Sequence, residues 1–149
     1  MSEYFVSKLG QFVGANEYLF VSDVISFLGW LNVTLLLLAG ALFTLRRINR
    51  YGFHNRNGFI RKIVKLLRTL HPYIGVLLLL SAYIHGDLAL GTIFTIHTGS
   101  LVLLIVVVMM LVATAGRKYR MKLWMKIHRT LALALFVAGF LHLFARNLL

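Results

Sequence analysis

Four long apolar segments constrain the fold of this chain more than any other feature of its sequence. They cover about 22–45, 70–88, 92–115 and 124–145, and the first contains no charge between Val24 and Leu45. A helix that crosses a bilayer core of about 30 Å needs roughly 20 apolar residues. Inside lipid, backbone groups must bond within the segment, which favours helices. The sequence predicts an all-α membrane protein in which residues 1–149 form a single four-transmembrane-helix domain.

The overall composition agrees with this prediction. Hydrophobic residues make up 60% of the chain and charged residues 13%, whereas average globular proteins have about half and a quarter. There is no cysteine, which excludes disulfides, iron–sulfur ligation and thiol chemistry.

Sequence outside and between the spans predicts several further details. Two amphipathic stretches, 3–13 and 59–69, are expected to form interfacial helices at the membrane surface. Because the residue before a proline resists helical torsions, Pro72 is expected to start or kink the second span. Glycine and aspartate favour turns, so a turn between the second and third spans is expected at the residues Gly86, Asp87 and Gly91.

The basic residues are distributed asymmetrically about the spans. Fourteen of the sixteen lie in two connections: Arg46, Arg47, Arg50, Arg56, Arg61, Lys62, Lys65 and Arg68, then Arg117, Lys118, Arg120, Lys122, Lys126 and Arg129. Excess Lys and Arg mark cytoplasmic loops, so both termini are expected to be extracytoplasmic. The expected location is the cell membrane, as a multi-pass protein of a bacterial or archaeal cytoplasmic membrane.

The net charge of +12 raises the question of an anionic partner. Basic juxtamembrane loops commonly attract anionic lipid headgroups, so membrane lipids are the expected partner. No nucleic-acid binding is expected, because the loops leave no room for a recognition fold.

Two pairs of histidines share one spacing. His71 and His85 are fourteen positions apart, as are His128 and His142. At 100° and 1.5 Å per residue, fourteen positions bring a side chain back to within about 40° of its first direction and about 21 Å along the helix. The second and fourth spans run parallel in an antiparallel bundle. His71 is therefore expected beside His128 near the cytoplasmic surface, and His85 beside His142 near the opposite one.

A histidine in a span is often only a packing residue that hydrogen-bonds across a helix interface. The repeated spacing favours a second interpretation, since polar groups at membrane depth tend to mark ion or electron pathways. Two histidines on facing helices suit the axial positions of a haem iron. Small residues, which allow a flat ligand to approach, follow or precede each histidine by about one turn: Gly75, Ser81, Ala82, Ala132, Ala138 and Gly139.

The other two histidines are interpreted differently. His97 lies at nearly the depth of His85 and His142, so it could contact a propionate, line a substrate pocket, replace His85 as a ligand or hydrogen-bond between helices. His54 lies in the polar stretch "YGFHNRNG" and is interpreted as a solvated loop residue.

The sequences "LHPYIGVLLLLSAYIH" and "KIHRTLALALFVAGFLH" resemble the haem-bearing helices of the ferric reductase-like transmembrane superfamily, and similar histidine pairs occur in cytochromes b561. The resemblance covers roughly residues 65–145. It implies a membrane cytochrome b in which His71, His85, His128 and His142 are the axial ligands of two haem b groups. The chain departs from the superfamily in having four spans rather than six, and it lacks the cytosolic flavin and nicotinamide domains of the oxidases.

The function predicted from these features is transmembrane electron transfer, as a cytochrome b or as the membrane subunit of an oxidoreductase. Electrons would pass from a cytoplasmic flavoprotein or a quinone-pool donor to an extracytoplasmic redox partner. Arg68 and Arg129 lie within a turn of His71 and His128, respectively, and are candidate residues for binding haem propionates. The alternative is that these arginine side chains only extend to the membrane interface, as long basic side chains commonly do. Two other functions remain open: a histidine-based metal-ion or proton transporter, and a membrane anchor subunit of a redox complex.

Overall fold

The computed structural model describes Ser7, residues 17–91 and residues 97–144. Within these residues the chain forms four helices and no strand: α2 (Glu17–Tyr51), α3 (Gly58–Leu90), α4 (Thr98–Lys118) and α5 (Trp124–Phe144). Each contains a stretch long and apolar enough to cross a membrane. The predicted all-α fold with four membrane-spanning helices is therefore confirmed. The interfacial helix expected at 3–13 lies outside the described residues, apart from Ser7.

Large apolar side chains cover the outer surface of these helices. Trp30 is 70% exposed and Leu133 is 68% exposed, which would be unfavourable over so wide an area in water. The buried core is small, and its central cluster takes one residue from each helix: Leu35, Leu78, Val106 and Leu135. An apolar exterior around a small core is the arrangement of a multi-pass membrane protein.

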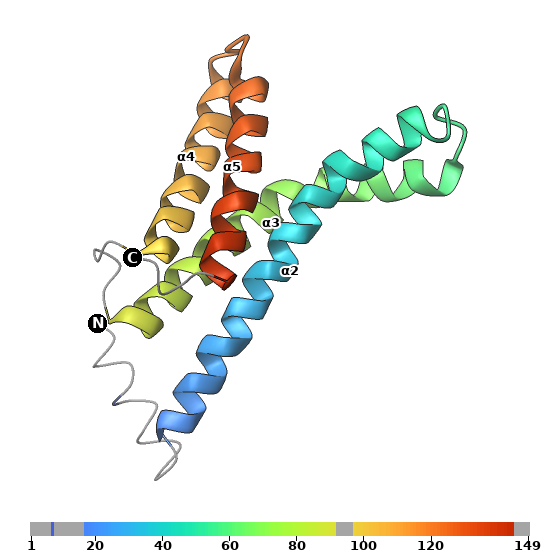
Figure 1. Ribbon diagram of the computed structural model, residues 1–149. Helices are drawn as coiled ribbons and strands as arrows, with labels where there is room; N and C mark the ends of the chain where they lie inside the picture. The colour runs from blue at the N-terminus through green and yellow to red at the C-terminus, as the bar shows by residue number, and fades with distance from the viewer. Residues whose placement is uncertain (1–6, 8–16, 92–96, 145–149) are drawn as a thin grey trace.

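The helices form two antiparallel hairpins, α2–α3 and α4–α5, which are drawn in blue to yellow-green and in orange to red (Figure 1). The connections at 52–57 and 119–123 lie at the same end of the molecule, where the tips of the hairpins point in different directions (Figure 1). We call this end, made of residues 46–68 and 117–129, the basic end. Helices α3 and α5 both begin at the basic end and run away from it.

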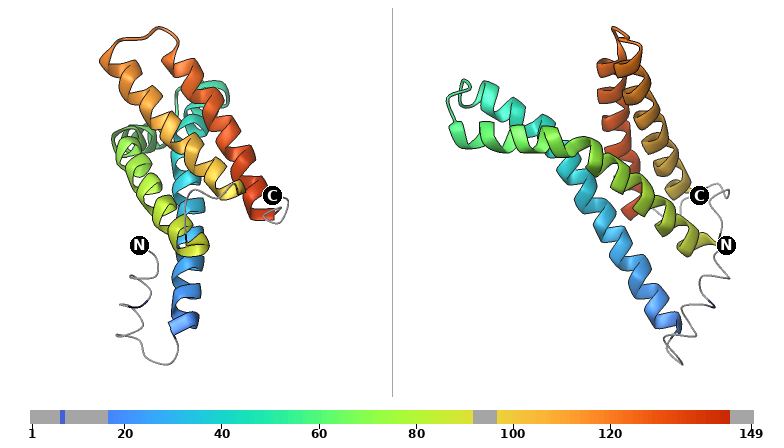
Figure 2. Two further views of the ribbon diagram at one scale, coloured as in Figure 1. Left: turned by 90° about the vertical axis from the view of Figure 1, so that its left-hand side faces the viewer. Right: turned by 180° about the vertical axis from the view of Figure 1, so that it is seen from behind.

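Helix α3 is longer than the sequence predicted. The expected interfacial helix at 59–69 and the second span are one continuous helix, with Pro72 inside it. The ribbon of α3 is bent rather than broken (Figure 2), which is a common effect of proline. Backbone groups in lipid need intrahelical partners, so a bend is tolerated where a break would not be.

The two ends of α3 have recognisable caps. The Asn57 side chain accepts a hydrogen bond from the Ile60 N–H at 3.0 Å. At the other end Gly91 adopts a left-handed conformation (φ 69°), and its N–H donates to the Asp87 carbonyl. Gly86 and Asp87 were expected in the turn, but both lie inside the helix. Gly91 alone has the backbone conformation that ends it, because glycine reaches positive φ without a steric cost.

Candidate functional site: two histidine pairs

The first histidine pair lies toward the basic end and joins α3 to α5. The ring centroids of His71 and His128 are 6.2 Å apart, with their planes at 77°. The Nδ1 atoms of both rings are buried and have no hydrogen-bond partner. We call these two residues the basic-end pair. Leaving a buried polar atom unsatisfied costs about 1–3 kcal/mol, so this site is incomplete as the protein alone forms it.

The second pair lies at the opposite end of the same two helices. The ring centroids of His85 and His142 are 6.4 Å apart, with their planes at 89°. We call these two residues the distal pair. Both predicted pairings by depth are thus present in the fold, because α3 and α5 are continuous helices that run in the same direction.

Each distal histidine is held by the helix that precedes its own. The Nδ1–H of His85 donates to the Ile25 carbonyl of α2 at 3.0 Å. His142 Nδ1 and Thr98 Oγ1 of α4 form a hydrogen bond of 2.9 Å. Bonds of this kind at one ring nitrogen fix the orientation of an imidazole and are typical of metal-binding histidines.

Glycines on α2 and α4 make room for the distal rings. A Cβ at Gly29 would lie 3.3 Å from His85 Cε1, and a Cβ at Gly99 would lie 3.1 Å from His142 Cε1. Both contacts would be tighter than ordinary van der Waals contact. Because these positions carry no side chain, each imidazole can approach the backbone of the neighbouring helix and reach its hydrogen-bond partner.

The spacing of both pairs is compatible with a shared metal ion. Metal–imidazole bonds of about 2.0–2.1 Å, as in zinc sites, would place the centroids of two opposed rings about 6.3 Å apart. The observed 6.2 and 6.4 Å are close to this value. Edge-to-face ring pairs without a metal also fall within about 4.5–7 Å, so the spacing permits a metal without requiring one.

The small residues near the histidines have different surroundings. Gly75, one turn from His71, has no other residue within 4 Å of the position that a Cβ would occupy. A Cβ at Gly139, near His142, would have Leu36 as its neighbour, at 3.5 Å. The Ser81 hydroxyl hydrogen-bonds the Asn32 side chain of α2. Open space beside a histidine of the basic-end pair is what a flat cofactor between helices would need.

His97 occupies the N-cap of α4 rather than a position inside a helix. Its amide donates to Ser100 Oγ at 2.9 Å, and the Ser100 hydroxyl donates back to the His97 carbonyl at 2.8 Å. The ring packed beside His142 is that of His85. In the loop 52–57, His54 is exposed and has a left-handed backbone, as a solvated loop residue would.

The two arginines predicted to bind propionates near the basic-end pair have different surroundings. The guanidinium of Arg129 lies over the Phe43 ring of α2, 5.8 Å from its centroid. Arg68 lines a cavity between α2 and α3. Neither of these two surroundings includes His71 or His128.

Sequence reasoning missed several residues that contact the histidines: Ile25, Gly29, Thr98, Gly99 and Trp124, whose ring centroid is 6.4 Å from that of His128. Ile25 acts through its backbone, so its identity gives no signal. Thr98 and Gly99 precede an apolar run. A polar and a small residue at such a place indicate the start of a helix, and they do not indicate contact with a histidine ring.

Among the described residues, no three or more His, Asp or Glu side chains are arranged to hold a metal ion by themselves. Comparisons of the chain with protein-family models, with curated proteins and with solved structures found no match.

Proposed function

We propose that this protein is a two-haem membrane cytochrome b that transfers electrons across a membrane. His71 and His128 would bind one haem b, and His85 and His142 the other. The observation that carries the proposal is the pair of matched histidine pairs on α3 and α5, with centroid spacings of 6.2 and 6.4 Å. Two axial imidazoles are a recognised way to hold a haem iron.

When bound, haem b supplies a one-electron carrier whose potential depends on its ligands and surroundings. The residues of the chain have separate tasks in this proposal. The four imidazoles bind iron, the Ile25 carbonyl and Thr98 hydroxyl orient the distal pair, and the absence of a side chain at Gly75 leaves space at the basic-end pair. The apolar exterior keeps the site within the membrane.

The charge asymmetry supports an orientation in which the basic end is cytoplasmic and both termini are extracytoplasmic. In that orientation the electron donor is a cytoplasmic flavoprotein or a membrane quinol, and the acceptor is an extracytoplasmic redox partner. We infer the cytoplasmic membrane of a bacterium or archaeon as the location.

The geometry gives less support to a metal-ion or proton transporter. Protein-only metal sites usually offer three or four ligands, whereas the described histidines contact one another in pairs. A role as an anchor subunit alone would leave the ordered hydrogen bonds of the distal pair unexplained.

The test is the visible spectrum of the purified protein from haem-replete cells, oxidised and then reduced with dithionite. We expect low-spin bis-histidine spectra, and a pyridine-haemochrome assay should give about two haems per chain. The matched control is His54→Ala, which should leave the spectrum unchanged. A colourless but folded preparation would exclude the proposal, and one haem per chain would restrict it to a single pair.

A further inference from the structure

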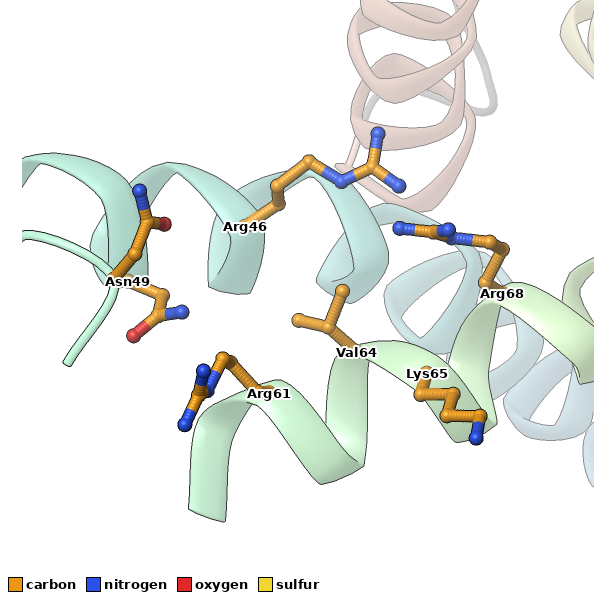
Figure 3. A pocket seen from close by; sticks show the side chains of 7 residues that line it. Arg46, Asn49, Arg61, Val64, Lys65 and Arg68 are labelled. Carbon is orange, nitrogen blue, oxygen red and sulfur yellow. The ribbon is translucent and has the colours of Figure 1, made fainter. Parts of the chain in front are cut away.

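A cavity of about 420 Å³ lies at the basic end between α2 and α3, and neither His71 nor His128 lines it. It is lined by residues of both helices and of their connection: Arg46, Asn49, Asn55, Arg61, Val64, Lys65 and Arg68. Figure 3 shows the Arg46 and Arg68 side chains extending toward each other from α2 and α3. Four of the seven lining residues are cations.

No acidic side chain of this chain is available in sequence near the cavity. Its four acids are Glu3, Glu17, Asp23 and Asp87, so none occurs from residue 24 to residue 86. Guanidinium groups that converge without a carboxylate repel one another, and an anion between them would relieve this repulsion. Arginine binds phosphate particularly well, because its planar fork donates two parallel hydrogen bonds.

Asn49 is a second and independent indication of a ligand. It lines the cavity, is only 5% exposed, and its side-chain Oδ1 is buried without a hydrogen-bond partner. An amide carries both donor and acceptor groups. A ligand that offered a hydroxyl beside its anionic group would satisfy the Asn49 oxygen while the arginines bind the anion.

The position of the cavity favours a lipid over a soluble anion. Helix α2 has 35 residues, which corresponds to about 52 Å and exceeds a bilayer core of about 30 Å. Arg46 directly follows the uncharged segment that ends at Leu45, which places it at the headgroup level. Exposed Leu66 and Leu70 on α3 provide apolar surface for acyl chains.

We infer that this cavity is a specific binding site for the headgroup of an anionic, hydroxyl-bearing phospholipid of the phosphatidylglycerol class. Arg46 and Arg68 bind the phosphate, and Asn49 accepts a hydrogen bond from a headgroup hydroxyl. This site goes beyond a general attraction of basic loops to anionic membranes, and it does not depend on haem binding.

The experiment is native mass spectrometry of the detergent-purified, full-length protein titrated with phosphatidylglycerol, phosphatidylcholine or glycerol 3-phosphate. We expect one tightly bound phosphatidylglycerol and no comparable binding of the other two. Arg46→Gln and Arg68→Gln should each weaken the first binding step by about tenfold, the usual effect of losing a charged hydrogen bond. Asn49→Ala should weaken phosphatidylglycerol binding by less.

The matched controls remove the same charge from neighbouring positions that do not line the cavity. Arg47 instead stacks over Phe43 and Tyr51, and Lys62 adjoins Arg61 in the helix. Arg47→Gln and Lys62→Gln should bind phosphatidylglycerol as the parent does. Equal weakening by the controls, or equal binding of phosphatidylcholine, would overturn the site. Equal binding of glycerol 3-phosphate would overturn its assignment to a lipid.

Circular dichroism and thermal unfolding identify any variant that fails to fold. Arg46→Lys and Arg68→Lys keep the charge and provide a second test. The lysine variants should still attract the phosphate but lose the two parallel hydrogen bonds of the guanidinium. Their affinities for phosphatidylglycerol should therefore lie between those of the parent and the glutamine variants. Full loss in a folded lysine variant supports the fork geometry, whereas parental affinity in both lysine and glutamine variants contradicts the site.

Discussion

At the scale of single residues, the distal pair depends on which imidazole faces His142. The structure places His85 there, with its Nδ1–H bonded to the Ile25 carbonyl. His97 is instead an N-cap residue whose backbone is bonded to Ser100. The ring paired with His142 is thus that of His85 and not that of His97, which makes His85 the proposed ligand at this position.

We expect His142→Ala and His85→Ala each to reduce the haem content from about two to about one per chain, because each removes one of the two imidazoles that would hold the proposed distal haem. His97→Ala should retain both haems. The measurement is the pyridine-haemochrome assay with reduced-minus-oxidised spectra. Loss of a haem in His97→Ala, together with its retention in His85→Ala, would show that His97 is the ligand.

Thr98 is expected to position His142 through their hydrogen bond. Thr98→Val keeps the side-chain shape but removes the hydroxyl, and loss of such a supporting bond typically weakens metal binding about 10–100-fold. Haem retention during dilution should fall and the midpoint potential of one haem should shift. Thr98→Ser should restore both properties.

Ser100→Ala is the control for this prediction, since it removes a nearby hydroxyl that bonds the His97 backbone. A Thr98→Val protein with unchanged haem retention and unchanged potentials would mean that Thr98 contributes only to packing.

At the scale of helices, two glycines have opposite surroundings. A Cβ at Gly116, at the end of α4, would collide with Trp124 Cβ and the indole ring at the start of α5. A Cβ at Gly75, in α3, would meet nothing within 4 Å. The first glycine allows two helices to approach closely, and the second lies beside unfilled space.

Gly116→Ala should therefore destabilise the protein by about 1–3 kcal/mol through overpacking, whereas Gly75→Ala should stabilise the haem-free protein by up to about 1 kcal/mol through helix propensity. Thermal unfolding in detergent checks both. Gly75→Leu adds the test of the cofactor space, because it should abolish only the haem of the basic-end pair. Two haems in folded Gly75→Leu would show that this space is not used.

At the scale of the whole molecule, the two hairpins have equivalent roles. In each, the second helix carries one histidine of each pair, and the first helix bonds the distal histidine at Nδ1. Each first helix also has a glycine against that ring. The candidate site thus arises between two similar halves, and neither hairpin forms it alone.

The orientation of the molecule can be tested directly because the chain has no cysteine. We expect Ser7→Cys to react with a membrane-impermeant maleimide on intact cells, and His54→Cys to react only after permeabilisation. The reason is the concentration of basic residues at the end that contains His54. The reverse labelling pattern would invert the topology and exchange the proposed donor and acceptor sides.

The sequence by itself determined the four-helix membrane fold, because hydrocarbon imposes helices on long apolar segments whatever their tertiary contacts. It also predicted which histidines lie together, since helical periodicity and chain direction are local properties. It could not determine that α3 continues through Pro72 and Gly86, or that Ile25 and Thr98 hold the distal rings. Those features depend on which backbone and side-chain atoms of other helices come within hydrogen-bonding distance. Only the packing of the two hairpins decides that.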